Sequence, residues 1–453
     1  MTDAEAALAL QVPPAVASRV QGNRLWALSI YVLILVGMLL IGRYQIGFLV
    51  PRILAAARQT RWMEWVAYLG AVWIELGFLL IVIRTVLWVA YRPAPSATYE
   101  TAPKLTVIIP AYNEGAMVLQ SIESAARADY PRERLEVLVI DDGSQDDTWA
   151  YISEAAARYP GLVTALRQPR NMGKREALAL GFMRARGEVL VTIDSDSVIE
   201  PGALLAIAGP FRDGRVGAVA GNVRVYNRLQ GLIPRMLHVR FVISFDMRRA
   251  AESVYRNVYC CPGALTALRA EAVRSVFPRW RSQSFLGARC TFGEDRAMTN
   301  YLLDSGYDTL YQRNAVVHTV VPQRFAKLCK MLLRWDRSYV REELRFARIV
   351  WKRPGVTRLL AAYDRLITNA RYPISYLSLG VLPVVIVQDP GIIALMLAVM
   401  GAISLFNVLY FLRSECSLNF VYGVLYAYVY SFALFWIFPY AIATVRARSW
   451  MTR

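Results

Sequence analysis

Histidine and cysteine are scarce in this sequence, which has two histidines and five cysteines among 453 residues. No two cysteines have the CxxC spacing, and only His238 and His318 can supply imidazole, which argues against a structural zinc site. The cysteines also show no pattern typical of a disulfide framework. They are Cys260, Cys261, Cys290, Cys329 and Cys416.

Acidic residues are few compared with basic ones. The sequence has 34 Asp and Glu against 52 Lys and Arg, a formal charge of +18, and 56% of its residues are hydrophobic. This combination predicts a membrane protein with a basic cytoplasmic part. The excess of basic residues suits nucleic acid, anionic lipid or a phosphate-bearing substrate. We expect no nucleic-acid partner, because there is no compact Lys/Arg tail and no zinc-finger spacing.

Two apolar stretches near the N-terminus are candidate membrane spans. Residues 25–42 are uncharged and long enough to cross a hydrocarbon core of about 30 Å. The second stretch, 65–91, contains Glu75 and Arg84. We expect Arg84 to extend towards the membrane interface. Glu75, near the middle, is costly unless it faces protein or water, so it is a weak indication of function.

Apolar segments return at 374–388, 391–411 and 419–444. Arginines at the extreme C-terminus indicate that this end is cytoplasmic. We therefore expect 419–444, which contains Pro439, to be interfacial or re-entrant. The loop after the first span carries four arginines and no acid, yet this arrangement places it outside, against the usual charge rule. Those arginines are Arg43, Arg52, Arg58 and Arg61.

The polar middle of the chain, from about 100 to 320, alternates short apolar runs with helical patterns. The runs at 105–114, 135–144 and 187–197 each read as a buried strand ending in polar residues, and 175–187 reads as a helix. This rhythm predicts a mainly parallel, Rossmann-like α/β sheet. Ligands of such sheets bind at the carboxyl ends of the strands. Helix capping accounts easily for one acidic residue at a strand end, but less easily for three such strand ends. We therefore expect a binding site at this edge of the sheet.

Acidic residues mark two of these strand ends. Asp142, in the motif DDGS, can accept hydrogen bonds from a base or ribose, or can simply form an Asx turn before a helix. Asp194 and Asp196 are one residue apart, so in an extended chain they point to the same side. Their oxygens can together hold Mg²⁺ or Mn²⁺ with a diphosphate.

Two helix starts carry charged residues whose roles the pattern leaves open. Lys174 and Arg175, in NMGKREA, either approach phosphates or are solvated. Glu294 and Asp295, in GEDR, favour the helix dipole in any protein, and equally suit proton transfer. A helix at 324–346 has aromatic and leucine residues at spacings of three and four, with basic residues on its other face, which predicts a helix at a membrane surface.

Taken together, the motifs resemble those of the membrane-embedded, processive family 2 glycosyltransferases, which include hyaluronan, chitin and cellulose synthases and nodulation chitooligosaccharide synthases. The resemblance covers about residue 104 to the C-terminus, with VIIPAYNEG, DDGS, NMGKREAL, DSDS, GEDR and RW in the family's order. Stretches 285–300 and 334–342 are most similar to hyaluronan synthases. The resemblance implies a glycosyltransferase-A fold with α-helical transmembrane and interfacial segments.

The resemblance also implies roles for particular residues. Asp295 would be the general base that takes the proton of the acceptor hydroxyl, which attacks C1 of a UDP-sugar with inversion. Asp196, with Asp194, would hold Mg²⁺ or Mn²⁺ that stabilises departing UDP. The remaining nucleotide or donor contacts implied are Asp142, Lys174, Arg296, Arg334, Trp450 and Arg453. The acceptor contacts implied are Glu294, Cys290 and Trp335.

The sequence departs from the family at three points. Met331 occupies a position that is usually glutamine, three residues before the arginine of the RW pair, and Met451 replaces a glycine of the terminal W-x-T-R segment. No span follows Arg453, in which respect the sequence is more similar to nodulation-type synthases.

We therefore expect a multi-pass enzyme of the cell (inner or plasma) membrane, with a cytoplasmic catalytic domain, that extends a growing β-linked polysaccharide. UDP-GlcNAc with UDP-GlcA would give a hyaluronan-like product; the alternative is a chitin-type synthase using UDP-GlcNAc only. The intact aspartates argue against an inactive membrane scaffold. The expected organisation is an N-terminal tail (1–24), a transmembrane hairpin (25–92), a cytoplasmic glycosyltransferase domain (100–320), amphipathic interfacial helices (322–372), a transmembrane or interfacial region (373–445) and a gating-like tail (446–453).

Overall fold

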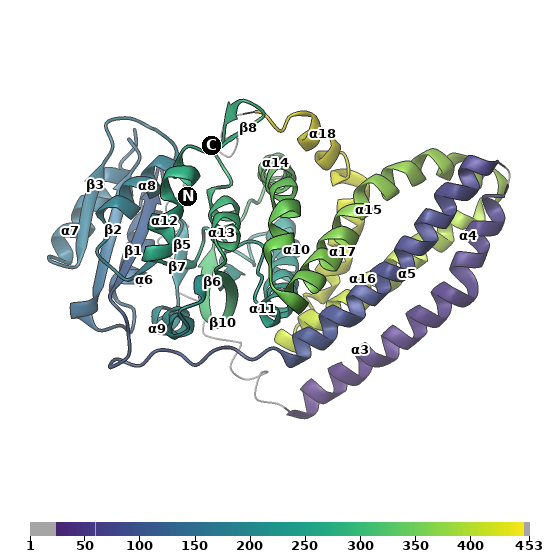
Figure 1. Cartoon of the computed structure of the whole chain (residues 1–453), viewed down its shortest axis with the longest axis horizontal. Helices are drawn as coiled ribbons and strands as arrows, with labels where there is room; N and C mark the ends of the chain where they lie inside the picture. Colours follow the sequence, from purple (N-terminus) through teal and green to yellow (C-terminus); the bar gives the residue numbers. More distant parts are fainter. Residues whose placement is uncertain (1–23, 59, 448–453) are drawn as a thin grey trace.

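The computed structural model describes residues 24–58 and 60–447. A sheet with flanking helices occupies one end of the molecule and long helices the other (Figure 1). The expected N-terminal tail and gating-like tail, including Trp450 and Arg453, lie almost wholly outside the described residues.

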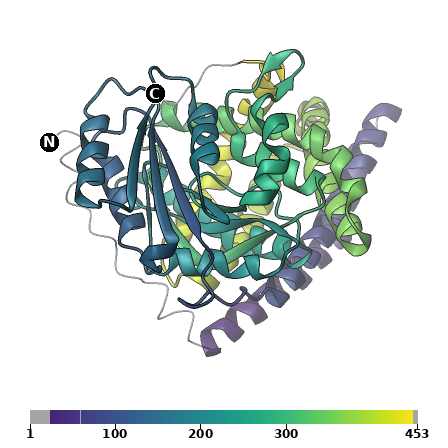
Figure 2. The same ribbon diagram turned by 60° about the vertical axis from the view of Figure 1, so that its left-hand side comes forward.

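An eight-stranded sheet forms the centre of the first part. Its strands are β1 (Leu105–Ala111), β2 (Leu135–Asp141), β3 (Val163–Arg167), β4 (Val189–Thr192), β5 (Ser197–Ile199), β6 (Val216–Val225), β7 (Thr266–Arg269) and β10 (Asp308–Thr319). Their order is β3-β2-β1-β4-β7-β6-β10-β5. Strands β3, β2, β1 and β4 are mutually parallel, as are β6 and β10, whereas β7 is antiparallel to both of its neighbours and β5 to β10. The twist of the sheet is visible in Figure 2.

The mainly parallel sheet confirms the predicted fold class. The three apolar runs form β1, β2 and β4, and every residue of β1 and β4 is buried. Helices on both sides account for that burial, because a strand covered on each face needs apolar residues throughout. The helices around the sheet are α6 (Met117–Ala126), α7 (Thr148–Arg158), α8 (Lys174–Arg184), α9 (Ala203–Ala208), α12 (Ala270–Arg281) and α13 (Glu294–Asp304). A small hairpin, β8 (Ser284–Phe285) with β9 (Ala288–Arg289), stands apart from the sheet.

Four helices of the described chain are long and apolar enough to cross a membrane. Three are α5 (Arg61–Ala90), α15 (Gly355–Gln388) and α16 (Gly391–Ser414), and the fourth, Leu25–Ala55, combines α3 (Arg24–Tyr44), η1 (Gln45–Leu49) and α4 (Val50–Ala56). A further apolar pair bends by 47°, as a broken span or a re-entrant loop would. It comprises α17 (Phe420–Val429), η6 (Tyr430–Leu434) and α18 (Ile437–Ala443).

The described helices differ from the expected segments in two places. The first span is longer than 25–42, and the boundary expected between 372 and 373 falls inside α15, which continues through Pro373 and Pro383. Proline normally ends a helix, but it is tolerated in membrane helices where neighbouring groups satisfy the freed backbone carbonyls.

Ion pairs show that the prediction for Arg84 is wrong, and one of them involves an arginine of the basic segment 43–61. Arg84 does not extend to an interface: its Nε lies 2.8 Å from Oδ2 of Asp364, so α5 and α15 are joined by a buried pair. At the opposite ends of the long helices, Arg52 lies 2.5 Å from Asp389. Arg52 belongs to α4, so α4 lies beside the loop between α15 and α16, and one of the four arginines of segment 43–61 is paired with an acid.

The helix α14 (Phe325–Ile349) lies between the sheet part and the apolar helices (Figure 1). The expected aromatic and leucine stripe is only partly buried, since Leu328 and Leu332 are buried whereas Phe325 is exposed. Much of the polar face is buried instead: Arg337, Arg341, Glu342 and Glu343 contact neighbouring protein. α14 is therefore packed between two layers of protein. A helix that lay only at a membrane surface would not have its polar face buried.

One hydrophobic core runs from the sheet into the membrane helices. It includes Ile30 of α3, Trp88 of α5, Val107 of β1 and Phe406 of α16. A short connector formed by α10 (Leu232–Val242), η4 (Ile243–Arg249) and α11 (Ala250–Val254) contributes buried side chains between them. The sheet part and the long apolar helices therefore share one continuous core.

Candidate active site

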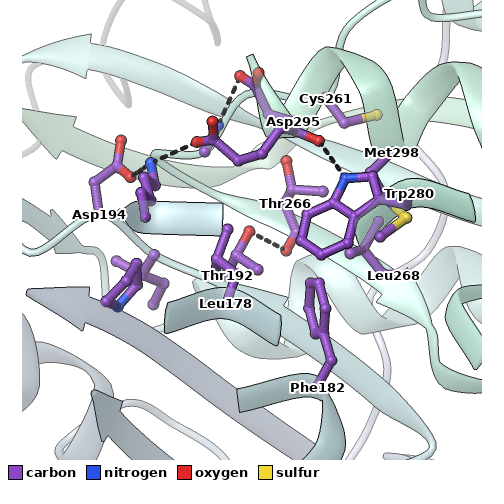
Figure 3. Close-up of a pocket in the computed structure, with 15 residues that line it drawn as sticks. Leu178, Phe182, Thr192, Asp194, Cys261, Thr266, Leu268, Trp280, Asp295 and Met298 are labelled. Atoms are coloured by element: carbon purple, nitrogen blue, oxygen red, sulfur yellow. Dashed lines mark hydrogen bonds and ion pairs between the residues drawn. The ribbon is translucent and has the colours of Figure 1, made fainter. Parts of the chain in front are cut away.

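A pocket lies where β1, β4, α8 and α13 converge with the loop before β7 (Figure 3). Its upper part carries carboxylates, among them Asp194 and Asp295, and Phe182 and Leu268 lie towards the other side. The pocket is lined by Pro110, Lys174, Leu178, Phe182, Thr192, Ile193, Asp194, Cys261, Gly263, Thr266, Leu268, Trp280, Glu294, Asp295 and Met298. Four of the sequence-predicted residues (Lys174, Asp194, Glu294 and Asp295) are thus brought together from positions up to 121 apart in the chain.

Asp295 is held in the first turn of α13. Its Oδ2 accepts a hydrogen bond of 3.3 Å from the backbone N–H of Gly263 and a weak one of 3.9 Å from the Cys260 thiol. Its Oδ1 accepts a bond of 2.7 Å from the N–H of Arg296. These contacts fix the direction in which the carboxylate points, as a proton acceptor requires.

Lys174 joins the two sides of the pocket. Its ammonium forms an ion pair with Oδ1 of Asp194 and lies 3.3 Å from Oε1 of Glu294. Burial alone would lower the pKa of Lys174, but the two carboxylates raise it above its ordinary value. Lys174 is therefore a permanent cation between the end of β4 and the start of α13. The structure does not support the alternative of a freely solvated lysine.

The two neighbouring carboxyls have opposite electrostatic environments. Burial acts to raise the pKa of Glu294, but the charge of Lys174, a backbone hydrogen bond and the charges of Arg175 and Arg334 together hold it below its usual range. Burial, followed by the negative charge of Glu294, raises the pKa of Asp295. Separated pKa values in a carboxyl pair are typical of sites where one group stays ionised and the other exchanges protons.

Trp280 and Arg175 support the start of α13 from below. The indole N–H of Trp280 donates a 2.9 Å hydrogen bond to the carbonyl of Glu294. Arg175 stacks over the Trp280 ring at 5.1 Å and donates a 2.6 Å hydrogen bond to its carbonyl. Trp280 was not assigned a place in the site from sequence. Arg175, for which the sequence left open a phosphate contact or solvation, is buried against Trp280 instead. Trp280 belongs to no local motif, and the contacts of Cys260 and Gly263 with Asp295 were likewise not predicted.

Asp142 and Asp196 lie outside the residues that line the pocket. Both carboxylate oxygens of Asp142 accept 2.8 Å hydrogen bonds from the backbone, one from Met172 and one from Gly173, so it anchors the loop before α8. Asp196 is half-buried and accepts hydrogen bonds from Ser197 at 3.2 Å and Thr319 at 3.3 Å.

The acidic pair at the end of β4 is suited to a cation shared with a ligand. No group of three or more His, Cys, Asp and Glu residues within the described ranges could hold a metal ion. Mg²⁺ and similar cations are commonly bound through one or two carboxylates together with substrate phosphates. Asp194, whose side chain is 31% exposed at the pocket, and the half-buried Asp196 fit this arrangement.

The remaining predicted contacts are not among the residues that line the pocket. Arg296 lies 2.9 Å from Glu343, and Arg334 is half-buried and close enough to Glu294 to lower its pKa. Trp335 packs beside Phe241 with the ring centroids 6.2 Å apart. Cys290 is buried and its backbone N–H bonds to Gln283, whereas the cysteine beside Asp295 is Cys260. The backbone bond of Cys290 is 3.0 Å long.

Ion pairs connect α13 to the membrane helices. Glu343 bridges Arg296 and Arg365 at 2.9 and 3.2 Å, and Arg365 lies 2.6 Å from Asp364. Asp364 in turn pairs with Arg84 of α5. The residue that follows Asp295 is thereby tied, through alternating charges, to two apolar helices.

Gly293 allows α13 to begin against α14. Its backbone is left-handed, with φ of 75°, and a Cβ at this position would lie 1.9 Å from Oγ of Ser338. We expect Gly293→Ala to destabilise the protein by about 3 kcal/mol, because backbone strain and steric overlap add. The measurement is thermal unfolding of the detergent-purified protein.

Gly306→Ala is the matched control for Gly293→Ala. Gly306 also has a positive φ, 89°, but no atom lies within 4 Å of its Cβ position. The Gly306→Ala substitution should destabilise the protein only through backbone strain, by about 1 kcal/mol. Equal unfolding temperatures for the two variants would show that contact with Ser338 does not constrain the start of α13.

Comparison with known proteins gives a consistent result. The profile of Glycosyl transferase family 2 matches residues 106–277. A hyaluronan synthase of Streptococcus pyogenes is 30% identical over 396 residues, which are 83% of this chain and 90% of that protein. An N-acetylglucosaminyltransferase of Rhizobium leguminosarum bv. viciae is 30% identical over 273 residues, 60% of this chain and 63% of that protein.

Among solved structures, the mannosyltransferase PcManGT from Pyrobaculum calidifontis, in complex with GDP-Man and Mn²⁺, has a TM-score of 0.54 at 20% identity. The similarity covers 80% of this chain and 99% of that one. It concerns the fold, and it agrees with the sheet described above.

Proposed function

The chain belongs to glycosyl transferase family 2, and from that premise we propose that it is a membrane-embedded synthase that transfers sugars from UDP-sugars to a growing β-linked polysaccharide, as a hyaluronan synthase does. The observation that carries the proposal is the pocket itself. One carboxylate with a raised pKa, Asp295, shares it with a lysine held between two further carboxylates. The apolar helices place this chemistry in a membrane protein.

The proposed reaction follows from these residues. Asp295 takes the proton of the acceptor hydroxyl, whose oxygen forms a bond to C1 of the donor sugar from the face opposite UDP. The bond between C1 and the UDP oxygen breaks, UDP leaves with the electron pair, and the configuration at C1 inverts. Gly263 and Cys260 orient the carboxylate that receives the proton. Lys174 supplies a fixed positive charge for the diphosphate.

Asp194 and Asp196 are the residues that would hold a divalent cation together with the diphosphate. Such a cation would act as a Lewis acid that stabilises negative charge on the leaving group. Chelation with EDTA is expected to lower turnover at least about 100-fold, and added Mn²⁺ or Mg²⁺ should restore it. Release of UDP, followed with a coupled assay, is the measurement.

Two variants, one just before β5 and one just after it, test which carboxylate is responsible. Asp196→Asn should raise the Mn²⁺ concentration needed for half-maximal activity about tenfold or more, because one anionic ligand is lost. Glu200→Gln, four residues further on and paired with His318 at 3.0 Å, should leave the metal requirement unchanged. The same requirement in both variants would place the cation elsewhere.

The test of the proposed function uses the protein purified in detergent. It is supplied with UDP-GlcNAc alone and with UDP-GlcA added, and the product is digested with hyaluronidase or with chitinase. We expect a polymer that needs both donors and is degraded by hyaluronidase. A chitinase-sensitive product from UDP-GlcNAc alone would establish the chitin-type alternative, and no product from any UDP-sugar would overturn the proposal.

A further inference from the structure

The loop 260–263, between α11 and β7, approaches both sides of the active site. Its Cys260 thiol and Gly263 N–H donate to the carboxylate of Asp295. On the other side, a Cβ at Gly263 would lie only 2.7 Å from Nζ of Lys174, so the loop backbone packs directly against that ammonium. The position of this loop therefore decides how the carboxylate of Asp295 is held.

Two side chains hold the loop from opposite sides. Nε of Arg249, the last residue of η4, donates a 3.1 Å hydrogen bond to the carbonyl of Cys260. Oγ1 of Thr299, in α13, accepts a 3.1 Å bond from the N–H of Cys261 and donates a 2.9 Å bond to the carbonyl of Asp295. Because the loop belongs to no helix or strand, its backbone groups depend on such side chains for partners.

The guanidinium of Arg249 is fixed by its own helix. η4 is a π-helix, in which residues five apart along the chain are brought together. Nη1 of Arg249 donates a 3.0 Å hydrogen bond to Oγ of Ser244, five residues earlier. The guanidinium also lies 3.9 Å over the ring of Phe245, which is buried. These contacts leave Nε directed at the loop.

η4 is anchored in turn to the sheet. Asp246 is buried and pairs with Arg224 of β6 at 2.6 Å and with Arg313 of β10 at 3.3 Å. It stands three residues before Arg249, so a shift of the end of η4 would disturb these pairs. A continuous series of contacts therefore leads from the sheet through Asp246 and Arg249 to the loop that holds Asp295.

We propose that Arg249 is a positioning residue for sugar transfer: by holding the carbonyl of Cys260, it keeps the N–H of Gly263 at the carboxylate of Asp295. This inference rests on the proposed function and adds a residue to it, because Arg249 is not among the residues that line the pocket. A base must meet the acceptor hydroxyl at the right distance and angle, and a misplacement of about 1 Å can lower a rate about 100-fold.

The first test is Arg249→Met, which removes the guanidinium and keeps a flexible side chain over Phe245. Turnover should fall at least about tenfold, because the loop loses the bond at Cys260. The affinity for UDP should stay within about twofold of wild type, since Arg249 does not contact the donor side of the pocket. UDP release and UDP titration are measured on the same detergent-purified preparation.

The second test, Thr299→Val, releases the same loop from its other side and changes no charge. A methyl group replaces a hydroxyl of nearly the same size, so the N–H of Cys261 loses its acceptor. Slower turnover with unchanged UDP affinity is expected again. Because both substitutions act through one loop, the double variant with Arg249→Met should be at most about twofold slower than the slower single variant. Losses that multiply fully would overturn the inference.

The pH dependence of turnover distinguishes positioning from direct electrostatics. Loss of the Gly263 N–H removes a donor that favours the ionised carboxylate of Asp295. The acid limb of turnover should therefore move to higher pH in both single variants. The other charged groups that act most strongly on this carboxylate are unchanged in both. They are Glu294, Lys174 and Arg296. A shift in Arg249→Met without a shift in Thr299→Val would mean that the charge of Arg249 acts directly, against the inference.

Arg269 supplies the matched control, because it also lies over a phenylalanine ring and donates to backbone carbonyls. Its guanidinium is 5.6 Å over Phe211, and its Nε donates a 2.8 Å bond to the carbonyl of Val216. It pairs with Val189 at the start of β4, whereas the pocket lies at the end of that strand. Arg269→Met should lower the unfolding temperature as Arg249→Met does, yet leave turnover within about twofold of wild type. An equal loss of turnover would assign the effect to a weakened fold.

Alkylation of Cys260 reports the position of the loop without any sugar transfer. The thiol is half-buried beside Asp295, and burial raises its pKa to about 11, so it should react slowly with iodoacetamide in wild type. Peptide mass spectrometry should show alkylation at least about threefold faster in Arg249→Met and Thr299→Val, and unchanged in Arg269→Met.

These measurements separate the inference from the proposed function. If wild type transfers no sugar, the proposed function fails by itself, and the alkylation of Cys260 still decides whether Arg249 holds the loop. If wild type transfers sugar while Arg249→Met keeps its turnover and its slow alkylation, the inference alone fails.

Discussion

Replacement of Asp295 by asparagine is expected to lower sugar transfer at least about a thousandfold, the size expected for loss of a general base. The amide has nearly the same shape, and it cannot take the proton of the acceptor hydroxyl. Gly263 N–H and the Cys260 thiol, which now hold the carboxylate, can still donate to the amide oxygen. The fold and the UDP affinity should therefore remain within about twofold of wild type. Turnover and UDP binding are measured on the same preparation.

The pH dependence of sugar transfer tests the role of Asp295 independently of the substitution. A base works only when ionised, so the rate should fall as the pH falls through the pKa of Asp295. Because burial and the charge of Glu294 raise that pKa, the acid limb should lie above the ordinary aspartate value of about 3.9. Glu294→Gln removes the neighbouring charge and should move the acid limb to lower pH.

Asp304→Asn, at the other end of α13, is the control for Asp295→Asn. Asp304 pairs with Lys352 at 2.6 Å on the surface, far from the pocket, so turnover should be unchanged. If Asp295→Asn lost UDP affinity as severely as turnover, Asp295 would have a structural role and the proton acceptor would be another group.

Replacement of Lys174 by methionine is expected to destabilise the protein by about 3 kcal/mol and to reduce UDP affinity at least about tenfold. The ammonium is the shared partner of Asp194 and Glu294, and the Glu294 side chain is only 6% exposed. Without the cation, the buried Glu294 carboxylate loses the largest of the charges that compensate it. Asp194 contributes less to this loss, because its side chain is 31% exposed and therefore partly hydrated. Thermal unfolding and UDP titration are the two measurements.

A double variant distinguishes the loss of the ion pairs of Lys174 from the loss of packing around its side chain. In Lys174→Met/Glu294→Gln the uncompensated charge is gone, so a large part of the stability should return while UDP affinity stays low. The difference between wild type and Lys174→Met should also shrink at acidic pH. Glu294 has a lowered pKa, so its contribution is present above the ordinary carboxyl pKa and is lost as the pH falls through the folded-state value.

Lys352→Met provides the matched control, because Lys352 also pairs with an aspartate, Asp304 of α13, but is 61% exposed. Exposed pairs contribute little, so this variant should unfold within about 0.5 kcal/mol of wild type. If Lys174→Met were equally harmless, the ammonium would not be the partner that keeps Glu294 ionised.

Local sequence patterns were sufficient for much of the fold. The continuous apolar runs that form β1, β2 and β4, and the helical pattern at 175–187 that forms α8, were recognisable locally. The continuity of α15 through Pro373 was not predictable in this way. This continuity depends on contacts with neighbouring helices, and a propensity rule for single residues does not include such contacts.

The site was predictable in its residue types but not in its contacts. The motifs pointed to Asp194, Lys174 and Asp295, and these do share a pocket. The bond from Gly263 to Asp295 and the ring of Trp280 beneath Glu294 were not predicted. Both depend on the position at which separate elements meet the sheet.

The sequence by itself determined the chemistry available to this protein: carboxylates at strand ends, a lysine at a helix start and apolar runs long enough to span a membrane. It did so because strand and helix periodicities are local properties of the chain. Only the tertiary structure decided that Lys174 stays charged between two acids and that Asp295 has a raised pKa. Burial and distance between remote residues set these properties, and neither exists until the chain has folded.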